Sequence, residues 1–207
     1  MADNNALANP GPLGLVGFGL TTVLLSLINA HILPQGGEAV VIPLALAYGG
    51  LIQLIAGILE FRTGNTFGVV AFTSYGAFWW WFALLLLLSG NGLIDLSAQG
   101  PTIGVALILW GFFTLYMWIG TFRLNRALWL VFLTLWITFF LLGVGGATGQ
   151  PTIAAIGGWV GILCGGLAMY TSFAEVTNHC FERTVLPVGP MKKGPSGPAA
   201  GPSESVR

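Results

Sequence analysis

The stretch LWLVFLTLWITFFLL, residues 128–142, contains no charged side chain and only two hydroxyl groups. A membrane β-strand is about ten residues long and alternates apolar with polar side chains, whereas this stretch is apolar on every side. Extended to residues 127–146, it reaches the roughly 20 residues that a helix needs to cross the hydrocarbon core of a bilayer. It therefore predicts a transmembrane α-helix.

Five other stretches of the chain meet the same requirement of length and apolarity. We expect an all-α, polytopic membrane protein with six transmembrane helices, at residues 13–33, 39–61, 66–88, 102–122, 127–146 and 152–175. Residues 1–12 are then an N-terminal cytoplasmic segment, residues 13–189 form the transmembrane domain, and residues 190–207 are a disordered cytoplasmic tail, because they are rich in Gly, Pro and Ser.

The composition supports a protein whose solvent is lipid. Of 207 residues, 55% are hydrophobic and 7% are charged, against about 25% charged in a soluble domain. Seven basic and seven acidic residues leave no net charge, so nothing attracts nucleic acid, and we expect none as a partner. Membrane lipid is the expected surrounding.

The positions of Lys and Arg predict the orientation, because basic residues concentrate in cytoplasmic loops. The opposite loops carry Glu38 and Asp95 and no basic residue. We therefore expect an integral protein of the cytoplasmic (inner) membrane with both termini in the cytoplasm, and a first span that is retained rather than cleaved. All seven basic residues lie on one side: Arg62, Arg123, Arg126, Arg183, Lys192, Lys193 and Arg207.

The sequence offers no catalytic set. His31 and His179 fall at opposite membrane faces, and Cys164 and Cys180 are too far apart for a disulfide or a zinc site. No phosphate-binding loop or nucleophile motif appears. We expect no enzyme activity, no metal and no cofactor.

Polar side chains inside apolar spans are costly unless they find partners or line water. Gln53 and Glu60 are seven residues apart and share a face of the second span. Gln53 fits an interhelical hydrogen bond and a functional role equally well, whereas for Glu60 we favour an ion pair with Arg62 or Arg123 at the membrane edge.

Glycines in the last span indicate close helix packing. Gly157, Gly161 and Gly165 recur every four residues, and small side chains let two helix backbones approach within a membrane. We interpret this row as a helix–helix contact rather than part of a substrate path.

The motif NPGPLGL at residues 9–15 marks the start of the first span. Proline is tolerated in the first turn of a helix, and the free N–H groups and dipole of that turn suit an anion. Because no Lys or Arg lies within a span, a permeating anion would depend on such dipoles and on hydroxyl and amide donors.

Three motifs resemble those of the acetate uptake transporter family, also called succinate-acetate permeases. They are NPGPLGLVGFGLTTVLLSLINA at residues 9–30, GNTFGVVAFTSYGAFWW at 64–80 and FERTVLP at 181–187. The alanine that the family usually has between the two prolines is Gly11 here. The similarity extends from Asn9 to Gly189.

The resemblance implies a funnel-shaped six-helix subunit that assembles into a hexamer and moves acetate, and in some members succinate, across the membrane. It implies a constriction made by Phe18, Tyr75 and Leu135, the last placed by spacing alone. It also implies that Gln53, Glu175 and Asn178 contact the substrate. With the first two residues of the motif, the expected substrate-binding residues are Asn9, Pro10, Gln53, Glu175 and Asn178.

We therefore predict transport of acetate and related small carboxylates through a pore in each subunit, channel-like or proton-coupled. The hydroxyl of Tyr75 is expected to donate to the substrate carboxylate. Glu175 either couples transport to protons or makes a local contact with Asn178 or Arg183. The alternative functions are an ammonium-conducting or sensory membrane protein, and a structural one whose polar residues serve packing.

Overall fold

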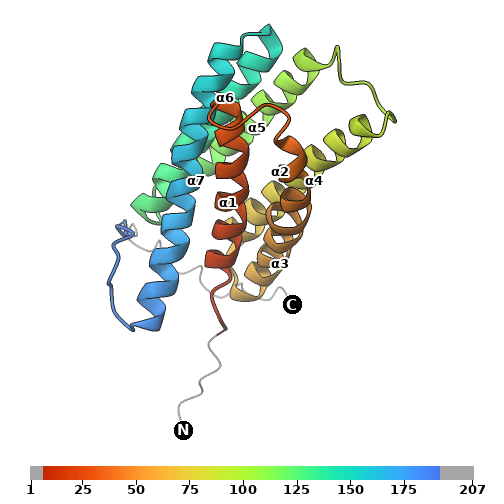
Figure 1. The fold of residues 1–207 in the computed structure, drawn as a ribbon. Helices are drawn as coiled ribbons and strands as arrows, with labels where there is room; N and C mark the ends of the chain where they lie inside the picture. The colour runs from red at the N-terminus through yellow and green to blue at the C-terminus, as the bar shows by residue number, and fades with distance from the viewer. Residues whose placement is uncertain (1–6, 192–207) are drawn as a thin grey trace, which may run out of the picture.

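The structure is a computed structural model in which residues 7–191 are described. Its helices form an upright bundle (Figure 1). Six stretches are long and apolar enough to cross a membrane, which confirms the prediction of six spans. The helices are α1 (Gly11–Asn29), α2 (Glu38–Leu44), η1 (Ala45–Ile52), α3 (Gln53–Thr63), α4 (Thr66–Gly90), α5 (Gly100–Thr121), α6 (Arg126–Thr148) and α7 (Pro151–Cys180).

Local sequence explains where several helices begin and end. Asn65 and Asn125 cap α4 and α6 by accepting hydrogen bonds from the backbone N–H groups three residues later, at 3.1 and 2.8 Å. The first span ends at Asn29 rather than at residue 33, because His31 takes a φ of 58° that a helix cannot contain. The last span continues to Cys180, five residues beyond its predicted end.

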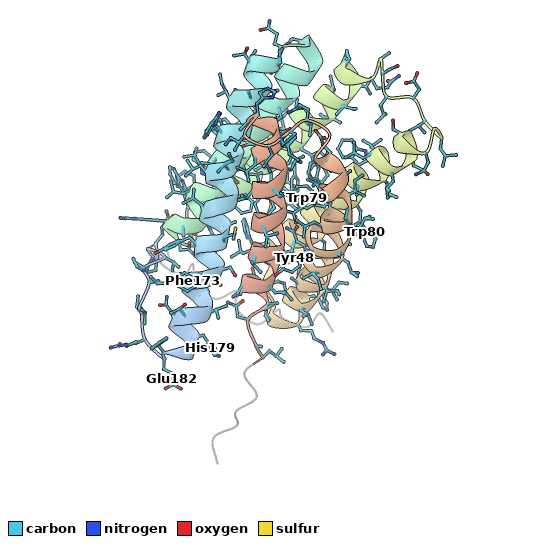
Figure 2. The ribbon with its side chains drawn as sticks, in the orientation of Figure 1. Tyr48, Trp79, Trp80, Phe173, His179 and Glu182 are labelled. Atoms are coloured by element: carbon cyan, nitrogen blue, oxygen red, sulfur yellow. The ribbon has the colours of Figure 1, made fainter. Side chains whose placement is uncertain are left out.

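The second span contains a π-helical segment that the sequence analysis did not predict. Pro43 lies inside α2 and has no N–H to donate, and the wider turns of η1 follow it. The indole Nε1 of Trp80 donates to the carbonyl oxygen of Leu46 at 3.0 Å, which satisfies one backbone acceptor of η1. Figure 2 shows Trp80 on α4 beside this segment. The segment joins α2 and α3 into one span.

Helix α1 packs most extensively against α7, while α6 lies between α5 and α7. Glycines of α7 make the α1 contact close: a Cβ on Gly165 would lie 2.7 Å from the carbonyl oxygen of Gly19. The row that faces α1 is Gly158, Gly161 and Gly165, whereas Gly157 faces Leu141 and Leu142 of α6. The predicted helix–helix contact through glycines is present, but Gly157 contacts α6 and does not share the face of Gly161 and Gly165.

Helices α4 and α5 share few backbone contacts and diverge toward the loop that joins them (Figure 1). Aromatic side chains fill the space between them, with Tyr75 and Phe78 of α4 packing against Trp110 and Phe113 of α5 at centroid distances of 5.3–6.1 Å. In the connecting loop, the Ser97 N–H donates to Asp95 and holds the pKa of that carboxyl below its usual value.

The first two residues of the predicted tail, Pro190 and Met191, contact the bundle. Met191 donates its N–H to the carbonyl oxygen of Leu124, and Pro190 pairs with Asn125, so these two residues lie against the loop between α5 and α6. The rest of the predicted tail, residues 192–207, lies outside the described residues, as do residues 1–6 of the N-terminal segment.

Candidate functional site

Two cavities lie within the bundle, one toward each end. The first, of about 370 Å³, lies at the end where α1 and α6 begin and α3 and α7 finish. The second, of about 600 Å³, lies toward the opposite end and reaches Asn29, Glu38 and Pro151. The first cavity is lined by five helices: Gly11, Leu15 and Phe18 of α1, Gln53 and Glu60 of α3, Ala71, Phe72 and Tyr75 of α4, Val131, Phe132 and Leu135 of α6, and Glu175 of α7.

Phe18 and Leu135 line both cavities and are the only residues common to their walls among the described residues. We call this pair the junction. Both side chains are buried, with 6% and 4% of their surface exposed. The ring of Tyr75 lines the first cavity and lies 5.8 Å from the ring of Phe18. Of the three residues assigned to a constriction from sequence, Phe18 and Leu135 therefore form a wall shared by the two cavities, and Tyr75 packs against Phe18 on the side of the first.

The hydroxyl of Tyr75 is already engaged. It donates to Thr114 Oγ1 of α5 at 2.9 Å, and Thr114 in turn donates to the carbonyl oxygen of Trp110 at 2.7 Å. The expected donation of this hydroxyl to a substrate carboxylate stays a prediction, and it would require the bond to Thr114 to break. The hydroxyl instead ties α4 to α5, and the aromatic ring is what Tyr75 presents to the cavity.

The start of α1 offers fewer donors than its position suggests. Pro10 and Pro12 have no N–H, and the N–H of Gly11 donates to Asn9 Oδ1 at 2.9 Å. The next N–H groups, from Leu13 and Gly14, return to the carbonyl oxygen of Pro10. The predicted anion site at this terminus is therefore not open, because its donors have internal partners.

Two carboxylates occupy the region beside this helix start instead. Asn9 Nδ2 donates to Glu175 Oε2 at 3.2 Å. Oxygens of Glu60 and Glu175 each lie 3.5 Å from the point where a Cβ on Gly11 would stand, so they are separated by no more than twice that distance. Both are near the positive end of the α1 dipole, which stabilises negative charge.

Glu60 does not form the predicted ion pair. It is 2% exposed, lines the first cavity and accepts a hydrogen bond from Thr63 at 3.0 Å. Within residues 7–191 no arginine forms an ion pair with it. Glu175 likewise contacts Asn9 rather than Asn178 or Arg183, the local partners considered for it from sequence.

Gln53 is 1% exposed and lines the first cavity. Its amide forms no hydrogen bond to the described part of the protein, and its Oε1 is fully covered without a partner. The interhelical hydrogen bond considered for it from sequence is therefore absent from residues 7–191. A buried polar group without a partner lowers the stability of the fold by about 1–3 kcal/mol, and the Oε1 of Gln53 carries that penalty.

Two residues of the predicted substrate set lie away from both cavity walls. Pro10 is buried at the start of α1 and accepts the N–H groups of Leu13 and Gly14. Asn178 accepts from the backbone N–H groups of Val185 and Leu186 and donates to the carbonyl oxygen of Leu186, at 2.7–2.9 Å. The Asn178 amide holds the chain after α7 in place through its oxygen and one of its two N–H groups.

The sequence analysis missed polar residues at the outer rim of the first cavity. Asn65, Arg123 and Asn125 all line it. A signal for two of them was present, because an asparagine directly before an apolar run is a typical helix cap, which places it at a helix start. Arg123 had been used to assign the orientation and as one possible ion-pair partner of Glu60.

A six-helix membrane bundle with two cavities that meet at buried apolar side chains has the architecture of a membrane transporter or channel. The model described as the GPR1/FUN34/yaaH family matches residues 1–193, and the chain belongs to this family. This confirms the resemblance drawn from the three motifs.

Individual relatives agree in sequence and in structure. The succinate-acetate/proton symporter SatP of Escherichia coli (strain K12) is 46% identical over 186 residues, which cover 90% of this chain and 97% of that protein. The solved structure of the bacterial acetate channel SatP is 45% identical, with a TM-score of 0.85, and the match covers 89% of this chain and all of that one. The ammonia transport outward protein 2 of Saccharomyces cerevisiae is 37% identical over 177 residues, covering 83% of this chain and 62% of that protein.

Proposed function

We propose that this protein transports acetate and related small carboxylates, including succinate, along a path inside each subunit. The path runs from the first cavity across the Phe18–Leu135 junction into the second. The observation that carries this proposal is the shared wall: the two cavities extend toward opposite ends of the bundle and have Phe18 and Leu135 in common. The names of the bacterial relatives supply the substrate class.

The chemistry of the walls suits a small amphiphilic acid. Arg123 and the amides of Asn65 and Asn125 line the rim of the first cavity, where they can attract a carboxyl group from water. Deeper walls are formed by side chains such as Leu15, Phe72 and Val131, which tolerate a methyl group. A solute with a larger apolar part or a second charge is expected to cross the junction more slowly.

We further propose the setting of this transporter. The distribution of Lys and Arg supports an inner-membrane protein with both termini in the cytoplasm, so the first cavity faces the cytoplasm. A homohexamer is proposed from the family resemblance. Apolar side chains exposed on α5 and α7, such as Leu109, Phe112 and Trp159, are available for lipid or for neighbouring subunits, and native mass spectrometry of the purified protein measures the subunit number.

Uptake of labelled acetate by proteoliposomes tests the transport function. Tyr75→Ala and Gln53→Ala are expected to change the initial rate, because both side chains line the first cavity. Phe173→Ala is a matched control, since Phe173 is 60% exposed on the outer face of α7 and lines neither cavity. Uptake no faster than that of empty liposomes would refute the proposal.

Ammonium transport is a second candidate. Two carboxylates, Glu60 and Glu175, line the first cavity, and carboxylates and aromatic faces both attract cations. One relative is named as an ammonia transport protein. Parallel measurements with labelled acetate and with an ammonium analogue such as methylammonium separate the two functions. Saturable uptake of methylammonium without uptake of acetate would favour this second candidate.

A further inference from the structure

Hydroxyl groups close to the junction are not free to bind an anion. Thr22 donates to the carbonyl oxygen of Phe18 at 2.7 Å, and Thr138 donates to that of Thr134 at 2.8 Å. Tyr75 donates to Thr114. A carboxylate can only accept hydrogen bonds, so these three hydroxyls cannot stabilise it unless their present bonds break.

The charges of the two cavities are also unfavourable for an anion. The charged groups in the walls are Glu60 on α3, Glu175 on α7, Arg123 in the loop between α5 and α6, and Glu38 at the start of α2. Three are acidic and one is basic. The basic one lies in a loop at the rim, and α4 and α6 contribute no charged side chain to either wall among the described residues.

Gln53 carries a buried polar atom without a partner in the wall of the first cavity. An amide carries a donor and an acceptor side by side, and the acceptor of this one, Oε1, is buried without a partner in the described protein. An undissociated carboxylic acid also carries a donor and an acceptor side by side, so acid and amide pair through two hydrogen bonds. A carboxylate would leave the amide oxygen unpaired. Oε1 is covered by protein atoms in this structure, and the soft terminal torsion of the amide lets it turn toward the cavity.

We propose that the species that crosses the Phe18–Leu135 junction is the undissociated acid, and that the Gln53 amide is the group that recognises it. This inference rests on the proposed transport of small carboxylates. Each carboxyl group then carries its own proton, so one proton moves with each acetate and no net charge crosses. Proton coupling therefore needs no titrating side chain within the path.

Two acetate analogues test the inference by competition. Acetamide is neutral and presents a donor and an acceptor, whereas methanesulfonate is a permanent anion with acceptors only. We expect excess acetamide to lower the protein-dependent uptake of labelled acetate several-fold, and methanesulfonate to leave it unchanged. The uptake by empty liposomes is subtracted, because undissociated acetic acid also crosses bare bilayers.

Gln53→Leu is expected to abolish the competition by acetamide, and Gln150→Leu is the matched control. Gln150 is an exposed glutamine before α7 and lines neither cavity. A second measurement needs no variant: with the unmodified protein, an imposed potassium diffusion potential should leave the uptake rate unchanged while the liposome interior acidifies.

Several results would overturn the inference while acetate transport itself stands. They are competition by methanesulfonate, absence of competition by acetamide, or an uptake rate that follows the imposed potential. Acetamide competition that persists in a folded Gln53→Leu protein would remove Gln53 from its role. Absence of any uptake above empty liposomes would refute the proposed function and this inference together.

Discussion

Two adjacent glycines of α7, Gly165 and Gly166, allow the contribution of the close α1–α7 contact to stability to be measured. A Cβ on Gly165 would lie 2.7 Å from the carbonyl oxygen of Gly19 and 3.0 Å from the backbone nitrogen of Val23. Both atoms belong to the α1 backbone and cannot rotate away. A Cβ on Gly166 would meet nothing within 4 Å. Gly165→Ala and Gly166→Ala thus add the same methyl group to neighbouring residues of one helix. The methyl group at residue 165 would press against α1, whereas the one at residue 166 would lie in open space.

The expected difference in stability follows from this geometry. Replacing glycine by alanine inside a helix stabilises it by roughly 0.5–1 kcal/mol at either position, so this contribution cancels when the two variants are compared. Overpacking at Gly165 costs about 1–3 kcal/mol. For a chain of this size, ~1 kcal/mol moves the unfolding midpoint by about 2–4 °C, so Gly165→Ala should unfold roughly 2–12 °C below Gly166→Ala.

Thermal unfolding of the detergent-solubilised protein, followed by tryptophan fluorescence, measures this difference. Gly19→Ala should behave like Gly165→Ala, because a Cβ on Gly19 would lie 2.8 Å from the carbonyl oxygen of Gly165. If Gly165→Ala unfolds at the same temperature as Gly166→Ala, or above it, α1 and α7 are not in the close contact described above.

Three further changes probe the cavities and helix ends. Phe18→Ala should raise the uptake of a bulkier acid such as benzoate relative to acetate in proteoliposomes; an unchanged ratio would contradict the junction as the narrow point. Thr114→Val should lower the free energy of unfolding by about 1–3 kcal/mol, because it leaves the buried Tyr75 hydroxyl unpaired. Adding Tyr75→Phe should restore most of that loss, and a purely additive double variant would argue against the hydrogen bond. Asn125→Ala should cost about 1 kcal/mol through the lost α6 cap, whereas Asn125→Asp should not; equal midpoints for the two would contradict the capping role.

The spans could be predicted because bilayer thickness sets helix length without reference to tertiary contacts. The glycine row was predicted only in part, because a spacing of four residues drifts around a helix that has 3.6 residues per turn. Gly157 therefore turns toward α6, while Gly158 takes its place against α1. The π-helical turns of η1 follow a proline, but their position depends on packing against α1 and α4, which no local pattern encodes.

The polar residues show a sharper limit of prediction. The sequence analysis expected Tyr75 and the start of α1 to donate to a ligand and placed Asn178 in the substrate set through the family resemblance. Each of them donates within the protein. Whether a donor is free depends on neighbours that are distant in sequence, such as Thr114 for Tyr75. Glu60 was assigned to an ion pair because Arg62 and Arg123 were placed at the same membrane edge, but in the structure Glu60 lines the first cavity.

The energetic balance explains why a path without fixed cations can still carry an acid. Protonating a carboxylate whose pKa is near that of a glutamate side chain costs about 3.7 kcal/mol at pH 7, from ~1.36 kcal/mol per pKa unit. Moving an ion into an apolar interior without a partner costs several kcal/mol even after relaxation. Because the hydroxyls near Phe18 and Leu135 have internal partners, the anion finds little compensation there, whereas the neutral acid can satisfy the Gln53 amide. Protonation of the substrate then lowers the energy barrier at the junction. The apolar side chains of Phe18 and Leu135 therefore exclude anions that stay charged, in addition to narrowing the path.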